Sequence, residues 1–462
     1  MNFQHLLGAP DASPIRSVLV GAGEFGVSFV SQCAGIDGLD VAVVCDRDLD
    51  RAKSAYERIG IDPGEIVVGD TKERVKLGVD NGRAVVVEDI SLIGDCSLDI
   101  VVEATGNAEA AVSNALFAID AGLHVAMVSK EAESVVGPYL HAKAVQAGVV
   151  YTPVDGDQPS LLIGLLSWAT ALGLEVVTAG KSSEYDFVYD VDGATITWTD
   201  RQITVPDFAE LWQLDLEHIG QTIDARAEAL AALPQRTVPD LCEMGVVANA
   251  TGLRPDVPGF HVPVARTIEI PDVFKLVEDG GVIFRPGVID VFNCLRRPDE
   301  ASFAGGVFVV VRCHDRGTWQ VLAGKGHPVS SDGGYAMLYN PQHLLGVEAP
   351  ISVLMACRQG VGTGASMPQA TTDLVAVAER DWRAGETLAI TNAHHHEVSG
   401  LEPMLIPAGP CVPERPLPYY MLAGQRLRCD VSAGTTIVRD MVEAPTDSIL
   451  WQTRERHDEH FF

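Results

Sequence analysis

The sequence is poor in basic residues and has no closely spaced cysteines and no long apolar run. Its 33 lysines and arginines stand against 63 acidic residues, which gives a formal net charge of −30. A surface this acidic repels nucleic acids and anionic membranes, so we expect neither as a partner. The nine cysteines are scattered without a CxxC pair. This disfavours a disulfide framework or a zinc site and favours a reducing compartment.

No segment has the character of a secretion signal or a membrane anchor. Residues 1–14 lack a basic start followed by an apolar run. The most apolar window, 161–174, is too short to span a bilayer and runs into Glu175, so we interpret it as a buried helix. We therefore expect a cytoplasmic protein.

The composition is that of a globular protein with two or three domains. Hydrophobic residues make up 47% and charged residues 21% of the 462 residues, which is enough apolar material for several cores. The first third alternates short apolar runs with helical stretches. This pattern is typical of a doubly wound parallel sheet, in which helices cover both faces. The expected strands are 17–20, 40–45, 84–87, 99–103, 124–128 and 149–154, and the expected helices are 24–34, 49–58 and 108–121.

The remaining two thirds of the chain change character twice. The middle region mixes helical and strand-like segments, whereas the last hundred residues are rich in proline and glycine. In that tail the stretches 375–387 and 427–436 each place an Ala-Gly turn after a short strand, which indicates a small β-rich domain. The expected helices of the middle region are 160–171 and 208–233, and its expected strands are 175–180, 303–313 and 319–323.

A glycine-rich loop joins the first expected strand to the first expected helix. Its spacing is GxGxxG, as in dinucleotide-binding folds, and its residues are Gly21, Ala22, Gly23, Glu24, Phe25 and Gly26. We expect Gly21 to allow a tight turn, Gly23 to let a pyrophosphate approach the backbone, and Gly26 to let the helix pack closely on the strand. The helix N-terminus would bind the phosphates. Strand, loop and helix together predict a bound nicotinamide dinucleotide.

Two residues after the second strand bear on which dinucleotide is bound. Asp46 lies about twenty residues beyond the loop, where an acid hydrogen-bonds the ribose 2′-hydroxyl of NAD. Arg47 follows at once and could instead pair with the 2′-phosphate of NADP. Both NADH and NADPH therefore stay open at this point.

Two further segments fit the nicotinamide end of such a cofactor. Ala104, Thr105 and Gly106 follow the fourth strand, where the backbone passes close to the cofactor, and Lys130 follows the fifth. A lysine in that position could polarise or protonate a carbonyl oxygen during hydride transfer. These features predict an α/β chain with a Rossmann domain at 1–156, an α+β catalytic domain at 157–366 and a small β-rich domain at 367–462.

Several motifs resemble known families. The first third, with GAGEFG, EATGN and VSKEAE, resembles the cofactor domain of homoserine dehydrogenases. The segments 155–190 (DGDQPSLLIGLLSWATALGLEVVTAGKSSEYDFVYD) and 338–350 (LYNPQHLLGVEAP) resemble the reductoisomerase-like oxidoreductases. That family includes a second type of 1-deoxy-D-xylulose 5-phosphate reductoisomerase, an NADPH enzyme of isoprenoid biosynthesis. The tail is similar to SAF domains at VAERDWRAGET.

The resemblance to reductoisomerases implies a rearrangement followed by hydride transfer. A rearrangement needs an electrophile on adjacent oxygens, usually a divalent metal, and an acid or base. Lys181, Glu184 and Asp186 cluster after an expected strand. If that segment stays extended, Glu184 and Asp186 face one side and could hold Mg²⁺ or Mn²⁺, while Lys181 binds a phosphate or donates a proton. Asp155 and Asp157 follow the sixth expected strand, on the side of the parallel sheet where ligands bind.

Three functions stay open on the sequence. The first is an NADPH-dependent reductoisomerase of a sugar phosphate, although no basic cluster marks a phosphate pocket. The second is a simple dehydrogenase of a hydroxy acid, a homoserine-like compound or a polyol, and the third is a non-catalytic dinucleotide sensor. In all three the partner is a small molecule, as substrate or as ligand, and all three are compatible with a homo-oligomer. We interpret the three consecutive histidines at 394–396 as a surface turn.

Overall fold

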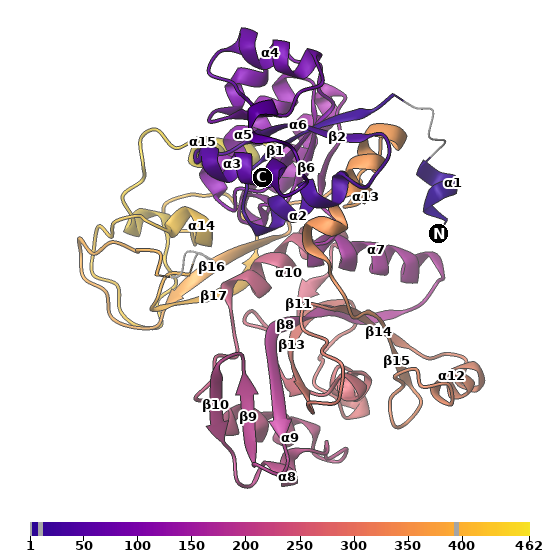
Figure 1. Ribbon diagram of the computed structural model, residues 1–462. Coiled ribbons are helices and arrows are strands. Elements are labelled where there is room, and N and C mark those ends of the chain that lie inside the picture. Colours follow the sequence, from indigo (N-terminus) through magenta and orange to yellow (C-terminus); the bar gives the residue numbers. More distant parts are fainter. Residues whose placement is uncertain (1, 8–12, 392–396) are drawn as a thin grey trace.

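The computed structural model describes residues 2–7, 13–391 and 397–462, so the three consecutive histidines lie outside the described residues. Figure 1 shows the parallel-sheet domain in indigo and purple at the top, a mixed α/β domain below it, and a yellow C-terminal part at one side. A short helix, α1 (Phe3–Leu7), precedes the first strand. Within the described ranges, no helix is long and apolar enough to cross a membrane. All nine cysteines are free thiols.

The first domain is the expected doubly wound sheet, with every strand pair parallel. The strand order is β3-β4-β2-β1-β5-β6-β7. Valine-rich runs form these strands and are buried on both faces, as a sheet covered by helices requires. The strands are β1 (Ile15–Val20), β2 (Leu39–Cys45), β3 (Val67–Val68), β4 (Val85–Val87), β5 (Ile100–Glu103), β6 (His124–Met127) and β7 (Tyr151–Pro153). The fold class predicted from the sequence is confirmed.

Most helices of this domain begin at a short polar residue that caps the first turn. The side chains of Asp48, Thr71 and Asn107 each accept a hydrogen bond from a first-turn backbone N–H. The helices are α2 (Glu24–Cys33), α3 (Leu49–Glu57), α4 (Lys72–Asp80), α5 (Ala108–Asp120) and α6 (Lys130–Ala147). Strand β3 and the helices α4 and α6 were not predicted from the sequence patterns.

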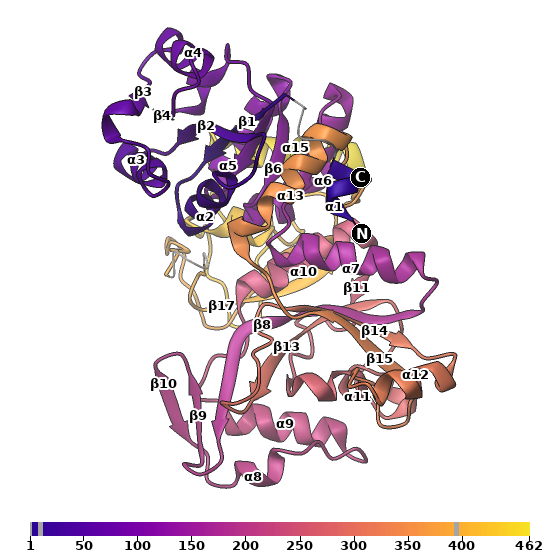
Figure 2. The same cartoon turned by 45° about the vertical axis from the view of Figure 1, so that its right-hand side comes forward.

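The second sheet is organised around β8 (Val176–Asp190), a strand of 15 residues. One edge of β8 pairs with β13, and the other edge pairs first with β14 and then with β9. Figure 2 shows α7 and α10 on the face toward the parallel-sheet domain and α9 and α11 on the opposite face. The other strands are β9 (Thr195–Trp198), β10 (Arg201–Thr204), β11 (Arg254–Pro255), β12 (Val264–Ala265), β13 (Val288–Arg296), β14 (Val307–Arg312) and β15 (Tyr335–Asn340).

Several segments of this domain differ from the sequence-based expectation. The strand expected at 175–180 continues through the polar run to Asp190, and the helix expected at 208–233 is two separate helices. The segment 319–323 is helical instead of extended, because Asp315 caps a helix that starts at Arg316. The helices are α7 (Gln158–Ala171), α8 (Phe208–Leu211), α9 (Ile219–Ala229), α10 (Val238–Thr251), α11 (Ile270–Val273) and α12 (Arg316–Ala323).

The chain then returns to the first domain. Helix α13 (Ala349–Leu354) buries Ala349 and Val353 in the core that α2 and α3 form on one face of the parallel sheet. Residues 349–354 thus pack with the first domain, and the domain boundary expected at residue 366 stays a prediction. In Figure 1 this segment is the orange helix beside the indigo strands.

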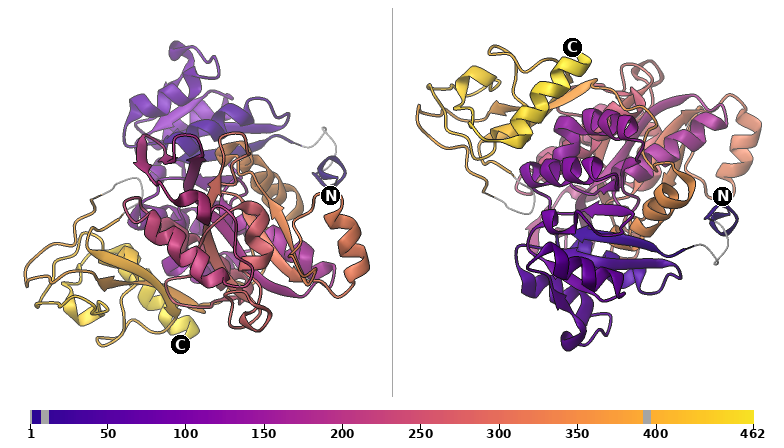
Figure 3. Two further views of the ribbon diagram at one scale, coloured as in Figure 1. Left: turned by 90° about the horizontal axis from the view of Figure 1, so that it is seen from below. Right: turned by 90° about the horizontal axis from the view of Figure 1, so that it is seen from above.

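The C-terminal part contains less regular β-structure than expected and two helices that were not expected. Its two-stranded antiparallel sheet consists of β16 (Thr372–Ala378) and β17 (Leu401–Pro407), and isolated bridges join its loops. A one-turn helix, α14 (Tyr419–Leu422), precedes α15 (Ile449–Phe461). Helix α15 packs against α5 and α6 of the first domain, as the view from above in Figure 3 shows.

Candidate active site

The glycine-rich loop is shaped by two close backbone approaches, at Gly21 and at Gly26. Gly21 has φ +97°, and a Cβ there would lie 2.5 Å from the carbonyl oxygen of Ala104. A Cβ on Gly26 would overlap the carbonyl oxygen of Gly21, so α2 packs directly on the end of β1. At Gly23, by contrast, a Cβ would meet nothing within 4 Å. The loop therefore leaves open space at the N-terminus of α2, where a pyrophosphate would fit.

On one side of this loop is a cavity of about 390 Å³, which we call the Asp46 cavity. Asp46 accepts hydrogen bonds from the backbone N–H groups of Ala22 (2.8 Å) and Asp48 (2.8 Å). Arg47 lines the cavity as well, together with Arg51, which was not singled out in the sequence. Arg51 approaches Asp48 at 3.6 Å, whereas Arg47 has no ion-pair partner in the described part of the chain.

On the other side is a larger cavity of about 650 Å³, the Lys130 cavity, which lies between the two α/β domains. Gly23, Ala104 and Thr105 line both cavities, so the two spaces meet over the loop. Glu24, Phe25 and Gly106 also line the larger one, as do residues of the second domain. The structure thus brings every residue expected at the cofactor to the walls of these adjoining cavities, except Gly26, which packs beneath the loop.

A chain of alternating charges ends at the Lys130 cavity. Lys130 begins α6 and forms an ion pair with Glu243 of α10, and its Nζ lies 3.9 Å from Asp157. Glu243 also pairs with Lys181, whose Nζ lies 2.9 Å from Asp240. The Lys130 side chain keeps 22% of its surface exposed, whereas the Lys181 side chain is fully buried. Lys130 therefore faces the cavity, and Lys181 stands behind Glu243.

This arrangement sets the protonation states of the cluster. Burial alone would lower the pKa of Lys130, but Asp157 and Glu243 outweigh it and raise that pKa well above its usual value. Burial would raise the pKa of Glu243, but the two lysines outweigh it and lower that pKa to about 2. For Asp157, burial wins over the attraction of Lys130, and its pKa is raised. Lys130 is thus held as an ammonium group beside an acid that is harder than usual to ionise.

The residues expected to hold a metal are not brought together. Glu184 is exposed and lines the Lys130 cavity, whereas Asp186 is bound by the Arg296 guanidinium at 2.8–3.0 Å and does not line it. The register of β8 against β13 shifts between Ser182 and Asp186, so the run is not the regular extended strand that the expectation assumed. Among the described residues, no group of three or more histidine, cysteine, aspartate or glutamate side chains could hold a metal ion. The residues present do not fit the expected metal site.

Three residues at the site were not singled out in the sequence analysis. Glu243 and Asp240 belong to α10, an otherwise apolar helix, and two buried acids three residues apart in such a helix are a signal that could have been used. His343 lines the Lys130 cavity next to Gly305, where a Cβ would overlap its imidazole ring. The segment around His343 also packs closely on α2. At Gly346 the contact is so close that a Cβ would overlap the carbonyl oxygen of Phe25.

A comparison with protein families finds one similarity, which covers most of the second domain. Residues 156–349 match the family model described as the catalytic domain of oxidoreductase DRL. This range contains Asp157, Lys181, Glu184, Asp240, Glu243 and His343. No curated protein matches the sequence.

The solved structures that match part of the chain include several oxidoreductases with a bound dinucleotide. GenD2 from gentamicin A biosynthesis, in complex with NAD, is 21% identical (37% of this chain and 44% of that chain; TM-score 0.27). An oxidoreductase from Agrobacterium radiobacter, in complex with NAD⁺, L-tartaric acid and magnesium, is 16% identical (47% and 55%; 0.28). The WlbA dehydrogenase from Bordetella pertussis, in complex with NADH and UDP-GlcNAcA, is 15% identical (37% and 46%; 0.27). The matched region spans about half of each of these structures.

The oxidoreductase match and the Rossmann loop meet at one cavity. Residues of the matched range and of the glycine-rich loop line it together, and Lys130 stands between them. Residues 156–349 are thus similar to an oxidoreductase catalytic domain, and they share a cavity with a glycine-rich loop of the dinucleotide-binding type.

Proposed function

We propose that this protein uses NADPH to reduce the carbonyl group of a small, uncharged, hydroxylated substrate bound in the Lys130 cavity. The observation that carries the proposal is the Lys130 ammonium group, which Glu243 holds at the wall of a 650 Å³ cavity beside the glycine-rich loop. When bound, the nicotinamide would supply the hydride. The protein would supply the proton and the orientation of the substrate.

The raised pKa of Lys130 keeps this group protonated at neutral pH, so that it can act as a proton donor. The ammonium group can donate a hydrogen bond to the carbonyl oxygen and then transfer its proton, because the alkoxide that forms is more basic than an amine. Glu243 holds the lysine in place and stabilises its charge. Asp157, at 3.9 Å and with a raised pKa, is positioned to return a proton to the amine. The reverse oxidation needs a neutral Lys130, which these acids disfavour.

The charge of the cavity argues for an uncharged substrate. Four acids line it, Glu24, Glu131, Asp157 and Glu184, against Lys130 as the single lysine. Lys130 is already paired, so a substrate phosphate would meet net repulsion there. A ketose or polyol avoids this cost and finds several hydrogen-bonding side chains.

A reductoisomerase acting on a sugar phosphate is the second candidate. It is favoured by the match over residues 156–349, which covers almost all of both segments that resemble that family. It would need an electrophile besides Lys130, and neither the Glu184–Asp186 pair nor a basic cluster provides one. Metal-dependent turnover of a phosphorylated hydroxyketone would support it.

The test is an NADPH-oxidation assay with matched neutral and phosphorylated hydroxyketones, each with Mg²⁺, with Mn²⁺ and with a chelator. We expect turnover of a neutral hydroxyketone that persists in the chelator. Turnover of only the phosphorylated compounds, with loss in the chelator, would establish the reductoisomerase instead. NADPH binding without turnover of any compound would indicate a dinucleotide sensor.

The preference for NADPH depends on Arg47. Because its guanidinium lines the Asp46 cavity without an ion-pair partner in the described residues, it is available for a 2′-phosphate. Arg47→Ala should weaken NADPH binding by about 1.5–3 kcal/mol, the contribution of a hydrogen bond to a charged group. Fluorescence titration measures this, with NADH as the internal control that should change little. Equal losses for both dinucleotides would show that Arg47 does not contact the 2′-phosphate.

A further inference from the structure

A third cavity lies between the start of α5 and the C-terminal part of the chain. Its volume is about 290 Å³, and we call it the Trp451 cavity. Gly106 and Glu131 line both this cavity and the Lys130 cavity, so the two spaces adjoin. The proposed hydride transfer uses only the Lys130 cavity and gives this neighbouring space no role.

The walls of the Trp451 cavity combine aromatic and uncharged polar side chains. Tyr420 and Trp451 are nearly buried, with 7% and 6% of their surfaces exposed. Asn107, Gln425 and Ser448 contribute amide and hydroxyl groups. The described lining residues include no lysine, arginine or histidine, so the cavity offers no cation to a phosphate or carboxylate.

One of the two acids that line it has a structural role. The Glu109 carboxylate accepts hydrogen bonds from the Ser448 hydroxyl (2.5 Å) and from the backbone N–H groups of Ile449 (2.5 Å) and Leu450 (3.3 Å). These groups form the N-terminus of α15, whose dipole compensates the negative charge. Glu109 thus fixes the helix that carries Trp451.

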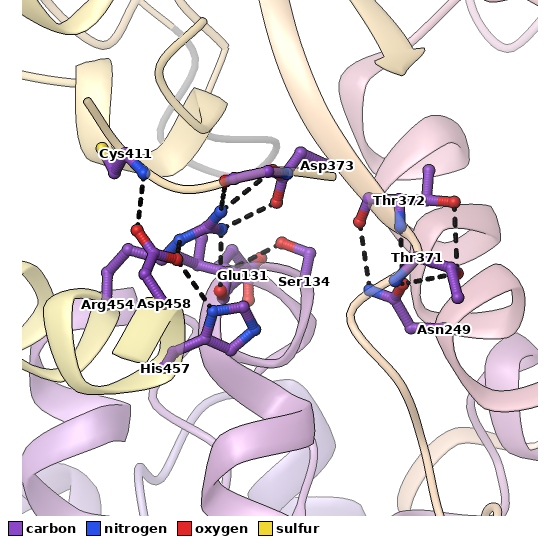
Figure 4. A network of polar contacts seen from close by, with 12 residues as sticks. Glu131, Ser134, Asn249, Thr371, Thr372, Asp373, Cys411, Arg454, His457 and Asp458 are labelled. Carbon is purple, nitrogen blue, oxygen red and sulfur yellow. Dashed lines mark hydrogen bonds and ion pairs between the residues drawn. The ribbon is translucent and has the colours of Figure 1, made fainter. Parts of the chain in front are cut away.

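A second contact holds Trp451 to the helix that carries the proton donor. Arg454, one turn after Trp451, pairs with Asp373 (2.7 and 2.9 Å) and Asp458 (2.7 Å). It also donates a hydrogen bond to the carbonyl oxygen of Val135 in α6, the helix that starts at Lys130. Figure 4 shows this guanidinium enclosed by its partners. The wall of the Trp451 cavity and the reacting group are therefore held in fixed relation.

We propose that the Trp451 cavity is a subsite for the distal part of the substrate, and that this part is an uncharged hydroxylated ring with an apolar face, such as a sugar ring. The Asn107 Nδ2 group and the Gln425 amide have no hydrogen-bond partner in the described residues and are available to hydroxyl groups. Aromatic side chains pack against the C–H face of such a ring. The inference rests on the proposed function, because the carbonyl of the same molecule would lie beside Lys130.

The first experiment measures ring binding without turnover. Methyl β-D-glucopyranoside and methyl β-D-galactopyranoside are titrated into the NADP⁺-loaded protein and followed by saturation-transfer NMR, with glucose 6-phosphate as a charged comparison. Ala423→Phe fills the cavity, and Ala433→Phe is the matched control at an exposed site outside it. We expect Ala423→Phe to weaken glycoside binding by about tenfold or more, as the loss of one or two hydrogen bonds would. Ala433→Phe should leave it unchanged, and glucose 6-phosphate should bind more weakly. If neither glycoside binds, or if both bind Ala423→Phe as well as wild type, the subsite does not exist.

The second experiment connects the ring to the reaction. It compares kcat/KM for dihydroxyacetone and for its O-glucoside with NADPH, in the wild type and both variants. Ala423→Phe should lower the value for the glucoside by about tenfold and leave dihydroxyacetone nearly unchanged, because only the longer compound reaches the cavity. Glycoside binding with equal effects on the two ketones would mean a separate ligand site and would overturn the proposal. Absence of turnover for both, with Ala423-dependent glycoside binding retained, would count against the proposed function and not against ring binding.

Discussion

Replacing Lys130 by methionine should reduce turnover by about 10²–10⁴-fold, the usual contribution of a positioned general acid. Methionine keeps much of the side-chain length but can neither donate a proton nor polarise a carbonyl oxygen. Dinucleotide affinity should change little, because the glycine-rich loop and the Asp46 cavity are untouched. The measurements are steady-state turnover and a fluorescence titration with NADPH on the same preparation.

The matched control is Lys143→Met, on the same helix. Lys143 pairs with Asp120 at the surface and lines neither cavity. Because Lys130→Met also leaves the buried Glu243 with Lys181 as its remaining ion-pair partner among the described residues, thermal unfolding should be recorded for both variants. A folded Lys130→Met protein with wild-type turnover would remove Lys130 from the mechanism.

The second large effect is expected at Gly23. Its backbone, at φ −76° and ψ −169°, is a conformation that valine adopts, and a Cβ there meets nothing within 4 Å, so Gly23→Val should fold normally. The valine side chain would occupy the space where the pyrophosphate approaches the N-terminus of α2. We expect affinity for NADPH and NADH to fall by roughly 100-fold, which corresponds to losing one or two hydrogen bonds to a charged group.

Gly220→Val serves as the control for that substitution. Gly220 is exposed in α9, and a Cβ there also meets nothing within 4 Å. Its affinity for both dinucleotides should equal that of the wild type. Unchanged affinity in a folded Gly23→Val protein would mean that the dinucleotide does not bind at this loop.

The first domain was predictable because its signals are local. Apolar runs such as 40–45 lie under helices on both faces, and the loop from Gly21 to Gly26 carries its own spacing. Strand limits differ from the predicted ones by only one or two residues. The same kind of signal was insufficient at 319–323, because a short apolar run is compatible with both a helix and a strand. At that segment the Asp315 side chain caps the first turn and thereby favours the helix.

The charge cluster could be anticipated only in part, because it is built from distant segments. Lys181 was singled out, but its burial behind Glu243 depends on how α10 packs against β8, which no local pattern encodes. Asp186 and Arg296 form an ion pair although they lie 110 positions apart along the chain. Helix α15 was missed because the proline-rich and glycine-rich composition before it predicted β-structure throughout the tail.

The central claim is that one dinucleotide occupies both cavities, with its reactive ring beside Lys130. A crystal structure of the NADPH complex tests it most directly. The account predicts that the pyrophosphate lies at Gly23, the 2′-phosphate at Arg47, and the nicotinamide in the Lys130 cavity with its C4 facing the open space next to the Lys130 ammonium group. A dinucleotide whose nicotinamide points away from Lys130, or that binds without contacting the glycine-rich loop, would contradict it.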